Sequence, residues 1–232
     1  MTEMIFTVSA FVFAALTLIA TILYQFAPCF KKRSLQGKML SSTMFVLTGI
    51  CSAIASGSFS AYTLLLVAAL IMAFFGDFFL DWKKGKHFYV GVTFFSLCHL
   101  LYIYAFVTKV EPDFATYTKQ FLIATAVLCV AAVFTVISDK IRFHGREWCM
   151  VVYSLILMAS FLCAAVRGAN MIIDGRNEFG ICLLAGAILF IVSDTFLASQ
   201  LYGQPKVKKP GIFVALTYFP AQALFALSMI YA

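Results

Sequence analysis

The chain has 232 residues and a formal net charge of +7, with 63% hydrophobic and 12% charged residues. An average soluble domain is about half apolar and about one quarter charged, so this composition excludes an ordinary water-soluble globule, a disordered chain and a nucleic-acid-binding arm. In a membrane protein, a surplus of lysine and arginine reports topology and does not imply an acidic partner.

Eight apolar segments are each long enough to cross the hydrocarbon core of a bilayer, which takes about 20 helical residues. They predict helices over residues 4–26, 38–56, 60–80, 87–107, 117–137, 147–167, 179–200 and 210–231. Only short links join these segments. The chain is therefore predicted to be an all-α, polytopic integral membrane protein, with eight transmembrane helices in one bundle that forms a single domain over residues 1–232.

The basic residues gather in every second link. Thirteen of them lie in or beside the links after the first, third, fifth and seventh segments, and four lie on the opposite side. Cytoplasmic loops are enriched in lysine and arginine, so the thirteen-residue side is predicted to be cytoplasmic and both termini outside or lumenal. The short links favour a bacterial inner membrane over the endoplasmic reticulum.

Two of the ten acidic residues, Asp77 and Asp194, lie inside predicted helices, each within the pattern small-Asp-x-Phe-Leu. A carboxylate in hydrocarbon costs several kcal/mol, so it normally faces the protein interior or a wet cavity. At a rise of about 1.5 Å per residue, Asp77 lies about 6 Å and Asp194 about 9 Å below the same cytoplasmic face. A lone aspartate often only bonds a neighbouring helix, but two at matched depth are predicted to face each other.

Other polar residues within the predicted helices are candidates for substrate binding. His99 and Tyr102 share one helix face, as do Tyr218 and Gln222. The candidates are Lys38, His99, Tyr102, Tyr153, Ser193, Tyr218 and Gln222. His99 lies about 18 Å from the cytoplasmic edge, so direct contact with Asp77 is not expected.

Each candidate also has a purely structural interpretation. A tyrosine in a membrane helix is more commonly an amphipathic ring at an interface or between helices. His99 is as well suited to a hydrogen bond between helices as to a site, and Lys38 to a snorkelling position at the surface.

Several chemistries lack the residues that they need. A three-histidine zinc site is not expected, because two of the three histidines lie in links; a mixed site of His99 and both aspartates stays open. There is no GxSxG motif, P-loop or GxGxxG motif, and the seven cysteines form no CxxC pair. The sequence therefore predicts no cofactor and no resident metal.

What remains is acid–base chemistry by the two aspartates. Two carboxylates held close together do not both ionise readily. One can therefore donate a proton while the other holds or activates water. The bond to be cleaved is expected to be acid-labile, in a substrate that arrives from the lipid.

Four short motifs occur in order along nearly the whole chain. They are Phe-Gly-Asp with Leu80 at 75–80, His-Leu-Leu-Tyr at 99–102, Gly-Ala-Ile-Leu-Phe-Ile-Val-Ser-Asp at 186–194 and Thr-Tyr-Phe-Pro-Ala-Gln at 217–222. Together with the eight predicted helices, this order resembles the YhhN-type lysoplasmalogenase family. The resemblance implies hydrolysis of the vinyl ether bond of lysoplasmalogens, which gives a fatty aldehyde and glycerophospho-ethanolamine or -choline.

This reaction suits the aspartate pair as the catalytic residues. An enol ether is hydrolysed by protonation of its β-carbon, and water captures the resulting oxocarbenium ion. A protonated aspartate supplies the acid, and an ionised one stabilises the cation and positions water. The lysophospholipid phosphate is expected near Lys38 and the Lys83–Lys86 cluster, with the vinyl ether several ångströms below and the site open to the cytoplasmic leaflet.

Three alternatives stay open. The first is a proton-coupled membrane transporter that uses Asp77 and Asp194 as a proton relay. The second is an intramembrane aspartyl protease, although the Tyr-Asp and Gly-x-Gly-Asp motifs of that class are missing. The third is a purely structural membrane protein.

Overall fold

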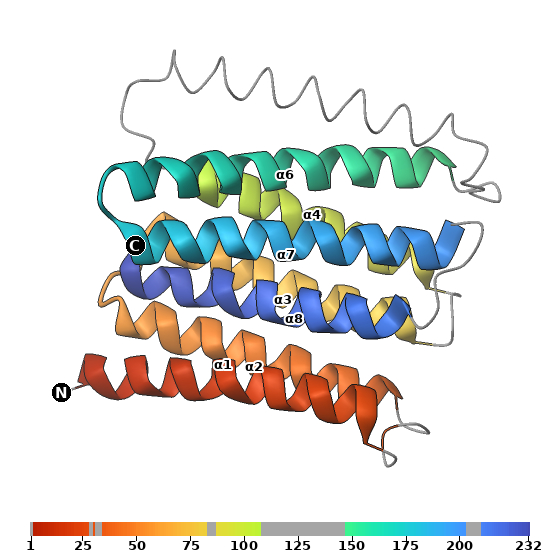
Figure 1. Cartoon of the computed structure of the whole chain (residues 1–232), viewed down its shortest axis with the longest axis horizontal. Coiled ribbons are helices and arrows are strands. Elements are labelled where there is room, and N and C mark those ends of the chain that lie inside the picture. The colour runs from red at the N-terminus through yellow and green to blue at the C-terminus, as the bar shows by residue number, and fades with distance from the viewer. Residues whose placement is uncertain (1, 28–29, 31–33, 83–86, 108–146, 203–209) are drawn as a thin grey trace.

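The computed structural model describes residues 2–27, 30, 34–82, 87–107, 147–202 and 210–232. These residues form long α-helices that lie side by side in one bundle (Figure 1). The helices are α1 Thr2–Phe26, α2 Ser34–Ala55, α3 Ala61–Asp81, α4 Phe88–Val107, α6 Glu147–Ile173, α7 Asn177–Tyr202 and α8 Pro210–Ser228, followed by a short 3₁₀ helix, η2 Met229–Tyr231.

All seven described α-helices are long and apolar enough to cross a membrane. They coincide with seven of the eight predicted segments, and the fifth segment, 117–137, lies outside the described residues. Consecutive helices run antiparallel, except that α4 and α6 run in the same direction (Figure 1). The chain is thus an integral membrane protein of the polytopic, all-α class.

Helix α8 lies at the centre of the bundle, where it packs against α1, α2, α3 and α7. The other main contacts are between α1 and α2, α3 and α4, α6 and α7, and α4 and α6. Both termini lie at one end of the bundle, and α3 and α7 terminate at the opposite end (Figure 1). We call this opposite end the aspartate end, because it carries Asp77.

Turn residues in the sequence explain where two of the links form. Gly57 and Gly175 have φ values of 61° and 82°, in the left-handed region that glycine adopts without steric cost. Gly57 ends the turn after α2, and Gly175 lies between α6 and α7. Ser60 caps α3, since its hydroxyl accepts a hydrogen bond from the backbone N–H of Thr63. Such a cap satisfies one of the free N–H groups at a helix start.

Two glycines bring helices close together, one beside Asp77 and the other about two turns before Asp194. A Cβ atom at Gly76 would come within 2.8 Å of the Phe95 ring, and one at Gly186 within 2.9 Å of the Phe225 ring. The small residue that precedes Asp77 therefore lets α3 approach α4, and Gly186 lets α7 approach α8. Close approach of this kind is the usual basis of helix packing in membranes.

Helix α6 continues to Ile173, beyond the predicted end at residue 167, so that Arg167 lies inside the helix and not at its end. Its side chain is buried, and Nη1 donates hydrogen bonds to the carbonyl oxygens of Ala105 (3.2 Å) and Phe106 (2.8 Å). These carbonyls belong to the last described turn of α4, so Arg167 joins α6 to α4. The guanidinium also lies over the rings of Tyr62 (5.1 Å) and Phe179 (5.4 Å).

Replacing Arg167 with methionine is expected to lower the free energy of unfolding by about 2 kcal/mol, because charged hydrogen bonds and cation–π contacts are lost together. Denaturant unfolding in mild detergent measures this change. Arg176 is a matched control, since its guanidinium also lies over Phe179 (5.3 Å) but is exposed. An equal loss of stability in Arg176→Met would contradict the bridging role of Arg167.

Candidate active site

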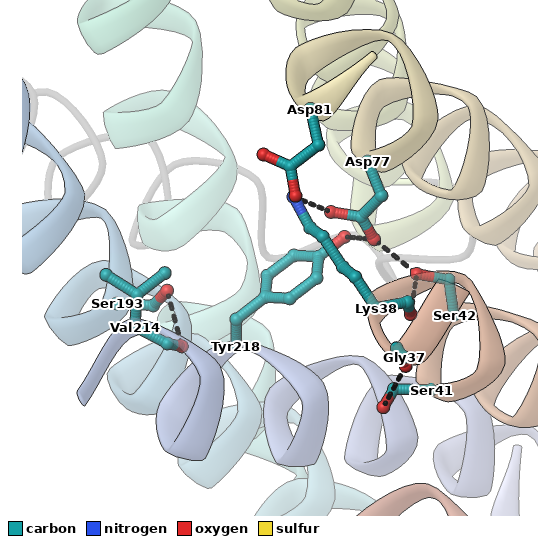
Figure 2. Close-up of polar contacts among 9 residues, drawn as sticks. All are labelled: Gly37, Lys38, Ser41, Ser42, Asp77, Asp81, Ser193, Val214 and Tyr218. Carbon is teal, nitrogen blue, oxygen red and sulfur yellow. Dashed lines mark hydrogen bonds and ion pairs between the residues drawn. The ribbon is translucent and has the colours of Figure 1, made fainter. Parts of the chain in front are cut away.

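Asp77 is buried near the end of α3, and side chains from α2 and α8 surround its carboxylate. The ammonium of Lys38 lies 3.3 Å from Oδ1. Ser42 and Tyr218 donate hydrogen bonds to Oδ2 at 2.7 Å and 2.9 Å (Figure 2). Both carboxylate oxygens therefore have donors, one of them charged, which is an arrangement that suits the ionised form.

Lys38 lies between two acidic residues of α3. Its ammonium is 3.4 Å from Asp81 Oδ2 as well as 3.3 Å from Asp77 Oδ1, and its side chain is only 14% exposed (Figure 2). In this position Lys38 acts as the counter-ion of Asp77. Its predicted contact with a substrate phosphate stays a prediction, and Lys83, Lys84 and Lys86 lie outside the described residues.

Asp194 lies in α7 and is also buried, but its surroundings differ. The hydroxyl of Tyr153, from α6, donates a hydrogen bond to its Oδ2 at 2.5 Å. In the part of the chain that the structure describes, no lysine, arginine or histidine forms an ion pair with Asp194. The two carboxylates thus differ in character, since a cation and two hydroxyls hold one while a neutral tyrosine holds the other.

The ring of Phe190, one helical turn before Asp194, links the side chains that bond the two carboxylates. This ring lies 5.5 Å from the ring of Tyr218, the partner of Asp77. It lies 4.8 Å from the ring of His99, which is 5.9 Å from the ring of Tyr153, the partner of Asp194. The aspartates therefore belong to one buried cluster, contributed by α2, α3, α4, α6, α7 and α8, which we call the aspartate cluster.

Three more of the predicted residues lie on its deeper side. Gln222 lies one turn beyond Tyr218 on α8, and its Oε1 accepts a hydrogen bond from the hydroxyl of Tyr102. The rings of His99 and Tyr102 are 6.1 Å apart. His99 contacts Tyr153 and Phe190, and Asp77 is bonded instead by residues of α2 and α8.

Ser193 is placed differently from the other candidates. Its hydroxyl donates a hydrogen bond to the backbone carbonyl of Val214 at 3.2 Å, which joins α7 to α8 away from the Asp77 contacts (Figure 2). The structure therefore gives Ser193 a contact between helices. Its predicted contact with substrate stays a prediction.

Sequence reasoning missed Ser42, Asp81 and Phe190 as parts of the cluster. A signal for Ser42 existed, because it follows Lys38 by four residues and so shares its helix face. Asp81 was recognised only as the end of a helix, and Phe190 only as an apolar residue within a motif. Neither gives a sign in the sequence of what it contacts.

Metal-ligand types are sparse around the cluster. Over the described ranges, no three His, Cys, Asp or Glu side chains group closely enough to hold a metal ion. The described cysteines are free thiols, namely Cys51, Cys98, Cys149, Cys163 and Cys182. The cluster instead offers two carboxylates of unlike surroundings, which is the arrangement that separates an acid from a base.

Comparison with known proteins relates most of the chain to one family. The model of the YhhN family matches residues 37–229. Lysoplasmalogenase TMEM86B of Sus scrofa is 29% identical over 176 residues, which cover 75% of this chain and 66% of that protein. Lysoplasmalogenase TMEM86B of Homo sapiens is 28% identical over 168 residues, which cover 72% and 64%.

A further relative is Lysoplasmalogenase TMEM86A of Bos taurus, which is 25% identical over 166 residues that cover 71% of this chain and 65% of that protein. The chain thus spans slightly less than two thirds of the length of these relatives. No solved structure is significantly similar to it.

Proposed function

The chain belongs to the YhhN family, and we propose that it is a membrane hydrolase that cleaves the vinyl ether bond of lysoplasmalogens. Relatives that are named lysoplasmalogenase support this reaction class. The observation that carries the proposal is the pair of buried carboxylates, of which Asp77 is ion-paired with Lys38 and Asp194 is bonded by the neutral Tyr153. The products are a fatty aldehyde and a glycerophospho-ethanolamine or -choline.

We base the proposed roles of the two carboxylates on their distances from the ends of their helices. Asp77 lies four residues before the end of α3, or about 6 Å, and Asp194 eight residues before the end of α7, or about 12 Å. A lysophospholipid taken from the bilayer keeps its phosphate at the surface, so its alkyl chain continues inward from the vinyl ether. The β-carbon, which must be protonated, is then deeper than the α-carbon. Asp194 is therefore the acid, and Asp77 faces the carbon that water attacks.

The first half of the reaction forms a hemiacetal. Asp194 transfers its proton to the β-carbon as the double bond opens, which leaves an oxocarbenium ion across the α-carbon and the ether oxygen. The Asp77 carboxylate stabilises this cation, and water adds to the α-carbon while one of its protons passes to Asp77. At this point Asp77 is protonated and Asp194 is ionised, which is the reverse of the starting state.

The second half returns both carboxylates to their starting states. Asp77 gives its proton to the ether oxygen as the bond from that oxygen to the α-carbon breaks, which releases the glycerophospho product. Asp194 takes the proton of the hemiacetal hydroxyl as the aldehyde carbonyl forms. One water is consumed in each cycle, and no further proton donor is needed.

The neighbouring side chains fit these assignments. Lys38, Ser42 and Tyr218 favour the ionised form of Asp77 before turnover. An aspartate buried without a cation is held more readily in its neutral form, and among the described residues Asp194 has no ion pair. Before turnover, Asp194 is thus the proton donor of the pair and Asp77 is its ionised member.

The test is to incubate the purified protein with a lysoplasmalogen and to measure free aldehyde. Release is expected from the vinyl ether substrate, and none from the matched saturated ether, because a saturated ether has no carbon to protonate. Activity is expected to persist in excess chelator. The proposal would be contradicted if no aldehyde were released. Solute uptake into sealed vesicles, driven by a pH gradient, would then support the transporter.

A further inference from the structure

Three buried nitrogen atoms on the deep side of the aspartate cluster have no hydrogen-bond partner within the described ranges. They are Nδ1 and Nε2 of His99 and Nε2 of Gln222. His99 is only 2% exposed, and Gln222 is fully buried. More than about nine in ten buried polar groups have a protein or water partner, so these atoms mark a place where another molecule binds.

Tyr102 links the two residues that carry these nitrogens. The Tyr102 hydroxyl donates a hydrogen bond to Oε1 of Gln222. Both hydrogens of Gln222 Nε2 are therefore left for another partner. The His99 ring lies 6.1 Å from the ring of Tyr102 and 4.8 Å from that of Phe190. It is also 5.9 Å from the ring of Tyr153, which holds the proposed acid Asp194.

The available donors and acceptors define the chemical class of the ligand. A neutral imidazole has one N–H donor and one acceptor nitrogen, and the Gln222 amide adds donors. A water or a hydroxyl can satisfy both the donors and the acceptor nitrogen, whereas a carbonyl oxygen accepts hydrogen bonds from the donors alone. The surrounding rings, Tyr102, Tyr153 and Phe190, make this environment apolar.

We infer that His99 and Gln222 bind the carbonyl oxygen of the aldehyde product once the glycerophospho product has left. This inference rests on the proposed function. The two residues form hydrogen bonds only, so the bonds made and broken are those of the proposed reaction. Their N–H groups donate hydrogen bonds to this oxygen after Asp77 and Asp194 have returned to their starting states.

Product inhibition by hexadecanal, compared with the effect of hexadecane, measures this interaction in the intact protein in detergent. The wild type is expected to be inhibited by the aldehyde at least about tenfold more strongly than by the alkane, which is the effect of about 1.4 kcal/mol of hydrogen bonding. His99→Phe keeps an aromatic ring but has no ring nitrogen, and Gln222→Met has no amide. Each is expected to lose most of this preference.

Two further variants keep the test interpretable. His99→Gln retains a donor and an acceptor and is expected to keep part of the aldehyde preference. His87→Phe is the matched histidine control, because His87 stacks on Trp82 (4.8 Å), and this variant is expected to behave as the wild type. Binding of hexadecanal is also followed directly by the rise in Tm, which does not depend on turnover.

The possible failures are distinguishable. If His99→Phe and Gln222→Met lower turnover but keep the wild-type preference for aldehyde, the inference is wrong and the proposed function stands. If the wild type releases no aldehyde, the proposed function is wrong. If the wild-type Tm responds equally to aldehyde and alkane, the oxygen-binding role of His99 and Gln222 is wrong, and the proposed function is not affected.

Discussion

Replacing Asp194 with asparagine is expected to lower aldehyde release by at least about a hundredfold, because a positioned general acid typically contributes 10²–10⁴-fold. An amide cannot supply the proton that the β-carbon needs. Its oxygen can still accept the hydrogen bond from Tyr153, so the variant is expected to fold. The measurements are the initial rate of aldehyde release and the Tm of the same preparation.

Thr195 provides a matched control beside Asp194. It is exposed on α7, and its hydroxyl bonds the carbonyl oxygen of Ile191 in its own helix at 2.8 Å. Thr195→Val is therefore expected to keep the wild-type rate. Wild-type turnover in Asp194→Asn would refute the acid role, and an equal loss in Thr195→Val would attribute the effect to a disturbed helix.

The helices were predictable from the sequence because the thickness of the bilayer sets a minimum length of apolar chain. Burial of Asp77 and Asp194 was predictable for a related reason, since a carboxylate exposed to hydrocarbon is costly. Both arguments consider only a single helix and the lipid that surrounds it. They need no knowledge of which helices are neighbours.

The partners of the aspartates could be identified only from the way the helices pack in the bundle. The spacing of Lys38 and Ser42 places them on one face of α2, but only the contact of α2 with α3 turns that face toward Asp77. Lys38 had therefore been assigned to the membrane surface and a phosphate. Whether an ammonium near a helix end meets water, lipid phosphate or a carboxylate depends on the neighbouring helix.

Arg167 illustrates the same limit at the other end of the bundle. The sequence predicts Arg167 as the last residue of the helix over 147–167, in line with the usual position of arginine at the ends of membrane helices. The carbonyl oxygens of Ala105 and Phe106 and the rings of Tyr62 and Phe179 instead provide partners inside the protein. These partners come from other helices, so residue type alone does not identify them.

The Lys38–Asp77 ion pair leads to a prediction that separates stability from catalysis. Lys38→Met is expected to lower the free energy of unfolding by about 2–4 kcal/mol, because removing one partner leaves the other charge buried without compensation. The estimate lies below the full range for buried pairs, since the Lys38 side chain is 14% exposed. The double variant Lys38→Met/Asp77→Asn is expected to recover most of the loss.

Recovery in the double variant follows from the remaining contacts of Asp77. An asparagine at residue 77 is neutral, and its oxygen can still accept hydrogen bonds from Ser42 and Tyr218. Aldehyde release is nevertheless expected to stay at least about a hundredfold below the wild-type rate, because the carboxylate that stabilises the cation and takes the proton from water is gone. Stability would then return without activity.

A double-mutant cycle measured by denaturant unfolding in mild detergent isolates this pairwise term. Asp81→Asn serves as the control, because the Asp81 side chain is 38% exposed and exposed ion pairs contribute about 0–1 kcal/mol. If the double variant is as unstable as Lys38→Met, the loss comes from packing of the lysine stem and not from an uncompensated charge. In that case the counter-ion role of Lys38 is refuted, and its ammonium is available for the phosphate of the substrate.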